Sequence, residues 1–204
     1  ELIHRPTDLQ DVRVVRYGQG IEVQATVPPE CEVIIASRSR RLTGRTGCGV
    51  CGTDSIDAVL KTLHPVPPTT PIAPHAIEVA LQAITSHQTL NTAAGTVHAA
   101  AWARRDGTAE LVREDVGRHN ALDKLIGALL ARGVNPREGF VVVTSRASFE
   151  MVQKTTVLGA PFLVAMSGPT GLAVRLAEQA GLTLVGFARG DRLTVYTRPE
   201  RLSL

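Results

Sequence analysis

The sequence is poor in cysteine, in long apolar runs and in lysine, and the first two shortages exclude whole classes of protein. Three cysteines in 204 residues are too few, and odd in number, for the disulfide-stapled scaffold of a small secreted domain. No run approaches the roughly 18–20 apolar residues of a membrane-spanning helix. Charge at Glu1 and Arg5 stands where a secretory leader would be apolar. We therefore predict a protein of the reducing cytoplasm that has no membrane partner.

Lysine is scarce because only 3 of the 22 basic residues are lysines, while the other 19 are arginines. Guanidinium groups bind phosphate through two parallel hydrogen bonds, so an arginine excess suits a phosphorylated ligand. A compositional bias of the lineage is the simpler explanation when this count is taken alone, since composition reports charge rather than any one site.

Hydrophobic residues make up 44% of the sequence and charged residues 20%, proportions typical of a packed globular protein. The length fits one domain. We divide it into a β-rich segment over residues 1–36, a loop rich in Gly, Pro and Arg over residues 37–74, and an α/β core over residues 75–204. Because the chain does not begin with Met, we expect the β-rich segment to be the remnant of a longer N-terminal part.

Apolar periodicity predicts the elements of each segment. Alternation over residues 12–27, interrupted by Gly18 and Gly20, predicts a β-hairpin, and residues 31–36 are expected to form another strand. In the core, strand patterns alternate with helix patterns, which predicts right-handed crossovers and a three-layer α/β/α sandwich. Helices are expected over residues 75–87, 120–131, 149–158 and 170–180, and strands over residues 96–103, 109–114, 140–144, 162–166, 184–188 and 193–197.

A Cys-x-x-Cys pair, Cys48 and Cys51, lies among four glycines in the long loop, which we expect to be mobile. A structural zinc site needs four ligands, and neither a second such pair nor a suitably spaced His pair is present. A thioredoxin-type redox pair would open a helix directly after a strand, whereas this pair lies deep in a loop. The third Cys, Cys31, is interpreted as a small buried apolar residue.

Sulfur carriage is the third interpretation of the pair, beside a zinc site that His64 and His75 would complete and a dithiol redox pair. A thiolate on a mobile loop can accept a sulfur atom as a persulfide and carry it to an acceptor. Arg45 would favour the thiolate electrostatically, and the second thiol of the pair could resolve the persulfide by disulfide exchange. Both cysteines share this setting, so the residues leave open which one accepts sulfur first.

Polar and charged residues gather where predicted strands end and helices begin. Five ionisable residues are expected to converge on one such turn, where Gly117 lets the backbone bend: Asp115, Arg118, His119, Asp123 and Lys124. A strand-to-helix junction of this kind commonly binds anions at the helix N-terminus, although a solvated turn capped by Asn120 is the structural alternative.

Three further strand ends repeat this arrangement. They carry Ser145 and Arg146 after one strand, residues 167–170 after the next, and Arg189 to Arg192 after the third. Each alone is weak evidence, because helix caps use Ser and Thr in any case. Together they would line one edge of the sheet with groups that bind phosphate, so we expect a large phosphorylated, nucleotide-bearing ligand there. Arg146, Arg189 and Arg192 would meet its phosphates.

At these residues the sequence resembles the formate dehydrogenase accessory sulfurtransferase family (FdhD). The resemblance rests on four stretches that follow one another in the family's order. They are Gly44-Arg45-Thr46-Gly47-Cys48-Gly49-Val50-Cys51-Gly52, residues 114–124 (EDVGRHNALDK), residues 145–154 (SRASFEMVQK) and Phe187-Ala188-Arg189-Gly190.

The resemblance implies a cytidine-deaminase-like α/β/α fold and a homodimer. It implies a sulfurtransferase that accepts persulfide sulfur from a cysteine desulfurase. The sulfur then passes to the molybdenum bis(molybdopterin guanine dinucleotide) cofactor, which formate dehydrogenase requires. A guanine nucleotide would mimic that cofactor. No nucleic acid is expected as a partner. Cys48 would carry the persulfide and Cys51 would assist. The cofactor is expected to meet Ser145, Arg146, Phe187, Ala188, Arg189, Gly190, Asp191 and Arg192, with Asp115 and His119 shaping the site.

The deaminase zinc signature is not met, because His98 is followed by Ala99 and Ala100 rather than by x-Glu, and Gly47 stands where Pro should precede Cys48. We therefore expect the deaminase fold without zinc and without the deaminase reaction. The alternative function is a non-catalytic cofactor-binding chaperone whose Cys pair senses redox state.

Overall fold

The computed structural model describes residues 3, 6–18, 20–39 and 63–203. The chain divides into two compact units, Glu1–Leu60 and Lys61–Leu204. This boundary lies inside the segment expected to be a loop over residues 37–74, most of which falls outside the described residues.

The first unit contains the expected hairpin, formed by β1 (Gln10–Tyr17) and β2 (Gly20–Thr26). Short 3-10 helices lie at Pro6–Asp8 and Pro29–Cys31, followed by α1 (Glu32–Ser39). The strand expected over residues 31–36 is therefore wrong. Pro29 at the first helical position and the hydrogen bond from the Cys31 N–H to the Pro28 carbonyl start a helical turn, which overrides the weak strand preference of the β-branched run that follows.

The second unit is built on a six-stranded sheet in the order β4-β3-β5-β6-β7-β8. The strands β5, β6 and β7 are parallel, β3 is antiparallel to both of its neighbours, and β8 is antiparallel to β7. Every strand and helix expected in this unit is present within a few residues. The strands are β3 (His98–Arg104), β4 (Ala109–Asp115), β5 (Gly139–Val143), β6 (Phe162–Ala165), β7 (Thr183–Arg189) and β8 (Arg192–Val195).

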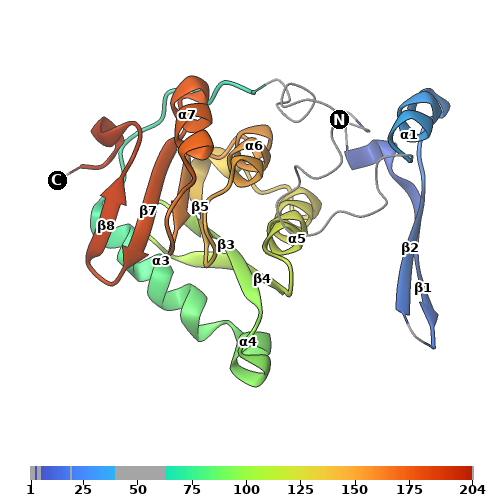
Figure 1. Ribbon diagram of the computed structural model, residues 1–204, viewed down its shortest axis with the longest axis horizontal. Helices are drawn as coiled ribbons and strands as arrows, with labels where there is room; N and C mark the ends of the chain where they lie inside the picture. The colour runs from blue at the N-terminus through green and yellow to red at the C-terminus, as the bar shows by residue number, and fades with distance from the viewer. Residues whose placement is uncertain (1–2, 4–5, 19, 40–62, 204) are drawn as a thin grey trace. The chain divides into compact units, whose positions relative to one another are not determined.

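Helices cover both faces of this sheet. The helix α3 lies against one face, while α5, α6 and α7 lie side by side against the other (Figure 1). This is the layering that the alternation of elements predicts; its likeness to the cytidine deaminases stays a prediction. The helices are α3 (Pro74–Ser86), α4 (Thr89–Ala94), α5 (Arg118–Ala131), α6 (Phe149–Leu158) and α7 (Gly171–Ala180), and short 3-10 helices lie at Pro136–Glu138 and Pro199–Arg201.

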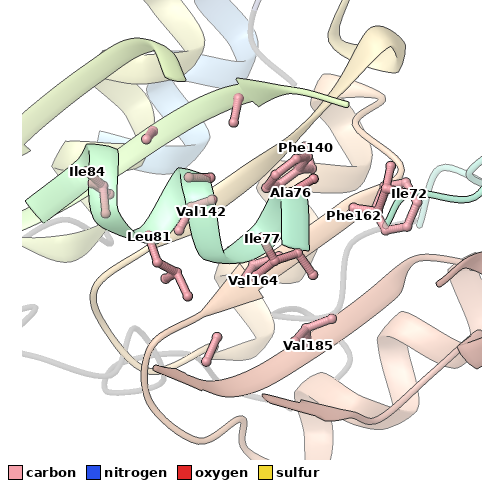
Figure 2. Close-up of a cluster of buried hydrophobic side chains, with 14 of the residues drawn as sticks. Ile72, Ala76, Ile77, Leu81, Ile84, Phe140, Val142, Phe162, Val164 and Val185 are labelled. Carbon is pink, nitrogen blue, oxygen red and sulfur yellow. The ribbon is translucent and has the colours of Figure 1, made fainter. Parts of the chain in front are cut away.

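The core on the α3 side is a continuous apolar cluster (Figure 2). Ile77, Ala80 and Ile84 of α3 recur at helical spacing and are fully buried. They face Phe140 and Val142 of β5, and neighbours on β6 and β7. Side chains alternate along a strand, so the intervening residues of β5 are directed to the opposite face. Both faces of β5 and β6 are buried under helices, which explains why the sequences of these strands are unbroken apolar runs.

Candidate site at the strand ends

The parallel strands β5, β6 and β7 end at one edge of the sheet, which we call the strand-end edge. Because β3 runs the opposite way, its first residue, His98, lies at the same edge and pairs with Asp115, the last residue of β4. The loops that follow β4, β5, β6 and β7 therefore emerge at one place. This confirms the sequence-based expectation that their polar residues line a single edge.

The loops at this edge are joined to one another by backbone hydrogen bonds. The Thr170 N–H donates to the Ala147 carbonyl at 3.0 Å, which ties the loop after β6 to the loop after β5. The Phe187 N–H donates to the Ser167 carbonyl at 3.3 Å, which ties β7 to the loop after β6. These two bonds connect the loop after β5, the loop after β6 and the end of β7.

Asp115 holds the turn between β4 and α5. One carboxylate oxygen accepts hydrogen bonds from the Gly117 N–H at 2.9 Å and from the Asn120 side chain at 3.2 Å, and the other lies 2.5 Å from the Lys124 ammonium. Lys124 and these two donors hold the pKa of Asp115 below its usual value, although partial burial opposes them. Asn120 thus bonds to Asp115 instead of capping the helix, and Asp115 shapes the turn with both oxygens engaged.

We expect Asp115→Asn to lower the free energy of unfolding by about 1 kcal/mol at neutral pH, because Lys124 loses its charged partner but is itself half exposed. A carboxylate with a lowered folded pKa stabilises fully above its unfolded pKa of about 3.9, and its contribution is lost as the pH falls through the folded value. Urea titrations at pH 7 and pH 3 should therefore show a difference at pH 7 that shrinks at pH 3.

The matched control is Asp123→Asn, which removes a more exposed carboxylate whose partner is Lys154. Its cost should stay within about 0.5 kcal/mol, as for other exposed ion pairs. An Asp115 variant as stable as this control at pH 7 would show that the turn does not depend on the carboxylate.

His119, at the start of α5, meets Glu150 in the first turn of α6. Nε2 of His119 lies 2.6 Å from Oε2 of Glu150, and each side chain is about three-quarters buried. The two atoms lie within ion-pair distance, and the imidazole carries a charge only when it is protonated. Burial raises the pKa of Glu150, but the contact with His119 and the charges of Lys154 and Arg118 outweigh it, so the net shift is downward.

His98 completes this group of ionisable side chains. Its pKa is lowered, first because the ring is partly buried and then because Arg118 and His119 lie nearby. A neutral imidazole is therefore favoured at His98.

Ser145 and Arg146 follow β5 but differ in exposure. Ser145 is buried, and its hydroxyl donates to the Arg146 carbonyl at 3.1 Å, so it serves the backbone of the loop. The Arg146 side chain is exposed. Of this pair, only Arg146 presents its side chain to solvent for a ligand.

Phe187 has a strained backbone and an exposed ring. Its φ is +51°, a left-handed value that is rare for a bulky residue, and it lies where the pairing register of β7 and β8 shifts. Phe187 is 54% exposed, whereas its neighbours Gly186 and Ala188 are buried. The ring lies over Gly168, where an added Cβ would come within 2.6 Å of it. The structure thus holds an aromatic face out at the strand-end edge.

The remaining residues expected to meet the cofactor form the tight turn from β7 to β8. Arg189 pairs with Arg192 across the turn, and Gly190 has a φ of +57°. The side chains of Arg189, Asp191 and Arg192 are exposed, whereas Ala188 is buried in the core and could meet a ligand only through its backbone. A solvent-open cavity of about 580 Å³ lies beside this turn. Arg189, Gly190 and Met166 line one of its sides, and the last turns of α3 line the other.

A cavity of similar size, about 600 Å³, lies at the opposite edge beside the turn from β3 to β4. Two of its three arginines already have protein partners: Arg104 pairs with Glu110, and Arg105 donates to the Thr69 hydroxyl and the Arg137 carbonyl. Groups satisfied within the protein have less to offer a ligand. We therefore place the candidate site at the strand-end edge.

Cys48, Cys51 and Arg45 lie outside the described residues. Cys31 is buried, as expected. Within residues 3, 6–18, 20–39 and 63–203, no group of three or more His, Cys, Asp or Glu side chains is placed to hold a metal ion. Across the same residues, no helix is long and apolar enough to cross a membrane.

Glu150 and His98 are the residues of this edge to which the sequence assigned no role, and it did not pair Lys124 with Asp115. Glu150 and Lys124 belong to recognisable stretches, but nothing in their spacing pairs Glu150 with His119 or Lys124 with Asp115. His98 stands alone on its strand. The only sequence signal was their position beside predicted strand ends.

Comparisons with known proteins agree with the resemblance seen in the motifs. The model of the FdhD/NarQ family matches residues 1–203. The chain is 47% identical over 196 residues to the sulfur carrier protein FdhD of Bordetella parapertussis. The aligned region covers 96% of this chain and 71% of that protein. It is 48% identical over 203 residues to the sulfur carrier protein FdhD of Xanthomonas campestris pv. campestris. Here the aligned region covers 100% of this chain and 72% of that protein.

A crystal structure described as that of a formate dehydrogenase accessory protein from Desulfotalea psychrophila shares the fold. The two superpose with a TM-score of 0.71 at 25% identity, over 98% of this chain and 74% of the other. Matches across nearly the whole chain, in sequence and in structure, leave one assignment: the chain belongs to the FdhD/NarQ family.

Proposed function

We propose that this protein is a sulfur carrier in the maturation of formate dehydrogenase. The observation that carries the proposal is the family membership, with relatives named sulfur carrier protein FdhD, combined with a Cys-x-x-Cys pair in the sequence. In this proposal Cys48 accepts sulfur from the persulfide of a cysteine desulfurase, and Cys51 assists its release. The sulfur passes to the molybdenum bis(molybdopterin guanine dinucleotide) cofactor. The protein acts in the cytoplasm as a homodimer.

The strand-end edge is where the cofactor would bind. Arg146, Arg189 and Arg192 are exposed there, and none has an ion-pair partner among the described residues, so all three can pair with phosphates. The exposed ring of Phe187 offers a face on which a guanine base can stack, and the cavity bordered by Arg189 and Gly190 gives the ligand room. Charge, aromatic surface and space thus coincide at one edge.

The test is mass spectrometry of the purified protein after incubation with a cysteine desulfurase and L-cysteine. We expect the peptide that contains Cys48 to gain the mass of one sulfur atom, and a reducing agent to remove it. The buried Cys31 is the internal control and should gain nothing. A Cys48 peptide that stays unmodified under conditions that load a known acceptor would overturn the proposal in favour of a chaperone with a redox-sensing pair.

A further inference from the structure

The cavity between α3 and the β7–β8 turn has an apolar floor. Leu81 of α3 belongs to the apolar cluster on that side of the sheet, and the partly buried Met166, which follows β6, packs against the same cluster. The volume of about 580 Å³ lies within the range of about 300–1,000 Å³ that is usual for small-molecule sites. Methionine adapts its shape to a neighbour and makes favourable contacts with aromatic rings. The floor therefore suits a flat aromatic ligand.

The wall that α3 contributes presents hydrogen-bond acceptors. The Thr85 hydroxyl donates to the Leu81 carbonyl at 2.9 Å, and the Ser86 hydroxyl donates to the Ala83 carbonyl at 2.9 Å. A hydroxyl has one hydrogen and two lone pairs, so both oxygens are left to accept from a ligand. The C-terminal end of a helix also carries partial negative charge, and the last turn of α3 has no basic residue to balance it. This wall therefore favours a ligand that donates.

The opposite wall is cationic. Arg189 borders the cavity from the β7–β8 turn, is exposed, and has no ion-pair partner among the described residues. A guanidinium group binds a phosphate or carboxylate through two parallel hydrogen bonds. The cavity thus has an acceptor side and a cationic side on either side of an apolar floor. The ligand that matches all three is a flat heterocycle with N–H groups on one edge and an anionic substituent on the other.

We propose that this cavity binds a 2-amino-4-oxo heterocycle, the ring edge that guanine and the pterins share, an inference that rests on the proposed cofactor function. The 2-amino group carries two N–H hydrogens, which the oxygens of Thr85 and Ser86 accept. The ring packs on Leu81 and Met166. The phosphorylated substituent of the ring extends towards the β7–β8 turn and meets Arg189.

The proposed cofactor needs more than one ring site. It contains two guanines and two pterins, and all four carry the same ring edge. The Phe187 ring lies over Gly168 on one side and is otherwise exposed, so it offers one face for stacking. Stacking on Phe187 therefore accounts for one ring, and the cavity provides a second ring site at the same edge of the sheet.

The test is titration calorimetry with two probes, 6-carboxypterin and GDP, which represent the two sources of this ring edge. In the double variant Thr85→Val with Ser86→Ala, we expect the affinity for at least one probe to fall by about fivefold to 150-fold, because two hydrogen bonds of ordinary strength are lost. A loss confined to 6-carboxypterin assigns the cavity to the pterin, and a loss confined to GDP assigns it to the guanine.

A second variant fills the cavity instead of removing its acceptors. Ser86 is exposed near the end of α3, so a larger side chain there does not disturb the core. Ser86→Trp should abolish the binding of the probe that the double variant identifies, because the indole occupies the space of the ligand ring. Circular dichroism confirms that each variant is folded.

The matched control is Thr92→Val on α4. Its hydroxyl also donates to the carbonyl four residues earlier, that of Gln88 at 2.8 Å, but it does not line the cavity. This variant should bind both probes as the wild type does. Wild-type affinity for both probes in the double variant, an equal loss in Thr92→Val, or a wild-type protein that binds neither probe would overturn the inference.

Sulfur loading distinguishes a failure of this inference from a failure of the proposed function. The wild type and the double variant are both incubated with a cysteine desulfurase and L-cysteine, and the Cys48 peptide is examined by mass spectrometry. Both should load. Normal loading with unchanged probe binding in the double variant would count against the ring site alone. A wild-type protein that binds the probes but does not load would count against the sulfur-carrier function alone.

Discussion

Cys48→Ala is expected to abolish the ability of this protein to restore formate dehydrogenase activity in a strain that lacks its own family member. An alanine has no sulfur with which to form an S–S bond, so the carrier step is lost rather than slowed. The measurement is formate dehydrogenase activity in cell extracts, with the amount of carrier protein checked by immunoblot. Activity should fall to that of the strain with an empty vector.

The control for this substitution is Cys31→Ala, which removes a thiol that is buried in the first unit. It should cost some stability, as small core truncations do, but leave maturation intact. Cys51→Ala separates the two members of the pair: in the proposed order, loading of Cys48 remains and release slows. Full activity with Cys48→Ala would assign the carrier role to another group.

Gly168→Ala is expected to weaken the binding of a guanine nucleotide, used as a mimic of the cofactor, by roughly fivefold to 150-fold. A Cβ at this position would lie 2.6 Å from the Phe187 ring, closer than real Cβ contacts allow, so the ring must move. The backbone of Phe187 is already in a left-handed conformation, which leaves it little freedom to adjust. Stacking of a base on an aromatic ring contributes about 1–3 kcal/mol, which corresponds to the stated loss.

Titration calorimetry with GDP measures this effect, and the same loop supplies the control. Gly171 opens α7, and an added Cβ there meets only the Arg175 guanidinium at 3.8 Å, an ordinary contact. Gly171→Ala should therefore bind the nucleotide as the wild type does. Phe187→Leu should match the loss in Gly168→Ala, because it removes the stacking face directly. Unchanged affinity in both Gly168→Ala and Phe187→Leu would show that the ring does not contact the base.

The helices and strands of the second unit were largely predictable, because their apolar residues follow the periods of 3.6 and 2 that burial on one or two faces requires. The helix α6 agrees with its predicted bounds, Phe149–Leu158. The helix α4 was missed because none of its six residues is buried, so it has no apolar period. Two of its N–H groups, on Leu90 and Asn91, instead donate to the Glu114 carboxylate, a contact made across a long stretch of chain.

The error over residues 31–36 has a different cause. A run of Val and Ile has a strand preference only when a neighbouring strand is available to pair with it, and such preferences are small. The prolines that precede Cys31 set a helical turn locally, and the chain continues it as α1. Short apolar runs without clear alternation are the segments in which helix and strand are hardest to distinguish.

The sequence by itself determined the family, the alternation of strands and helices, and the presence of a Cys-x-x-Cys pair and an arginine excess, because these depend on residue types and short spacings. Only the tertiary structure decided which charged groups face one another. His119 meets Glu150, Asp115 meets Lys124, and the Phe187 ring lies over Gly168. Such contacts follow from the order and direction of strands in the sheet, which bring distant loops to one edge, and no local pattern records that distance. The fold thus assembles the strand-end edge from residues that the sequence keeps far apart.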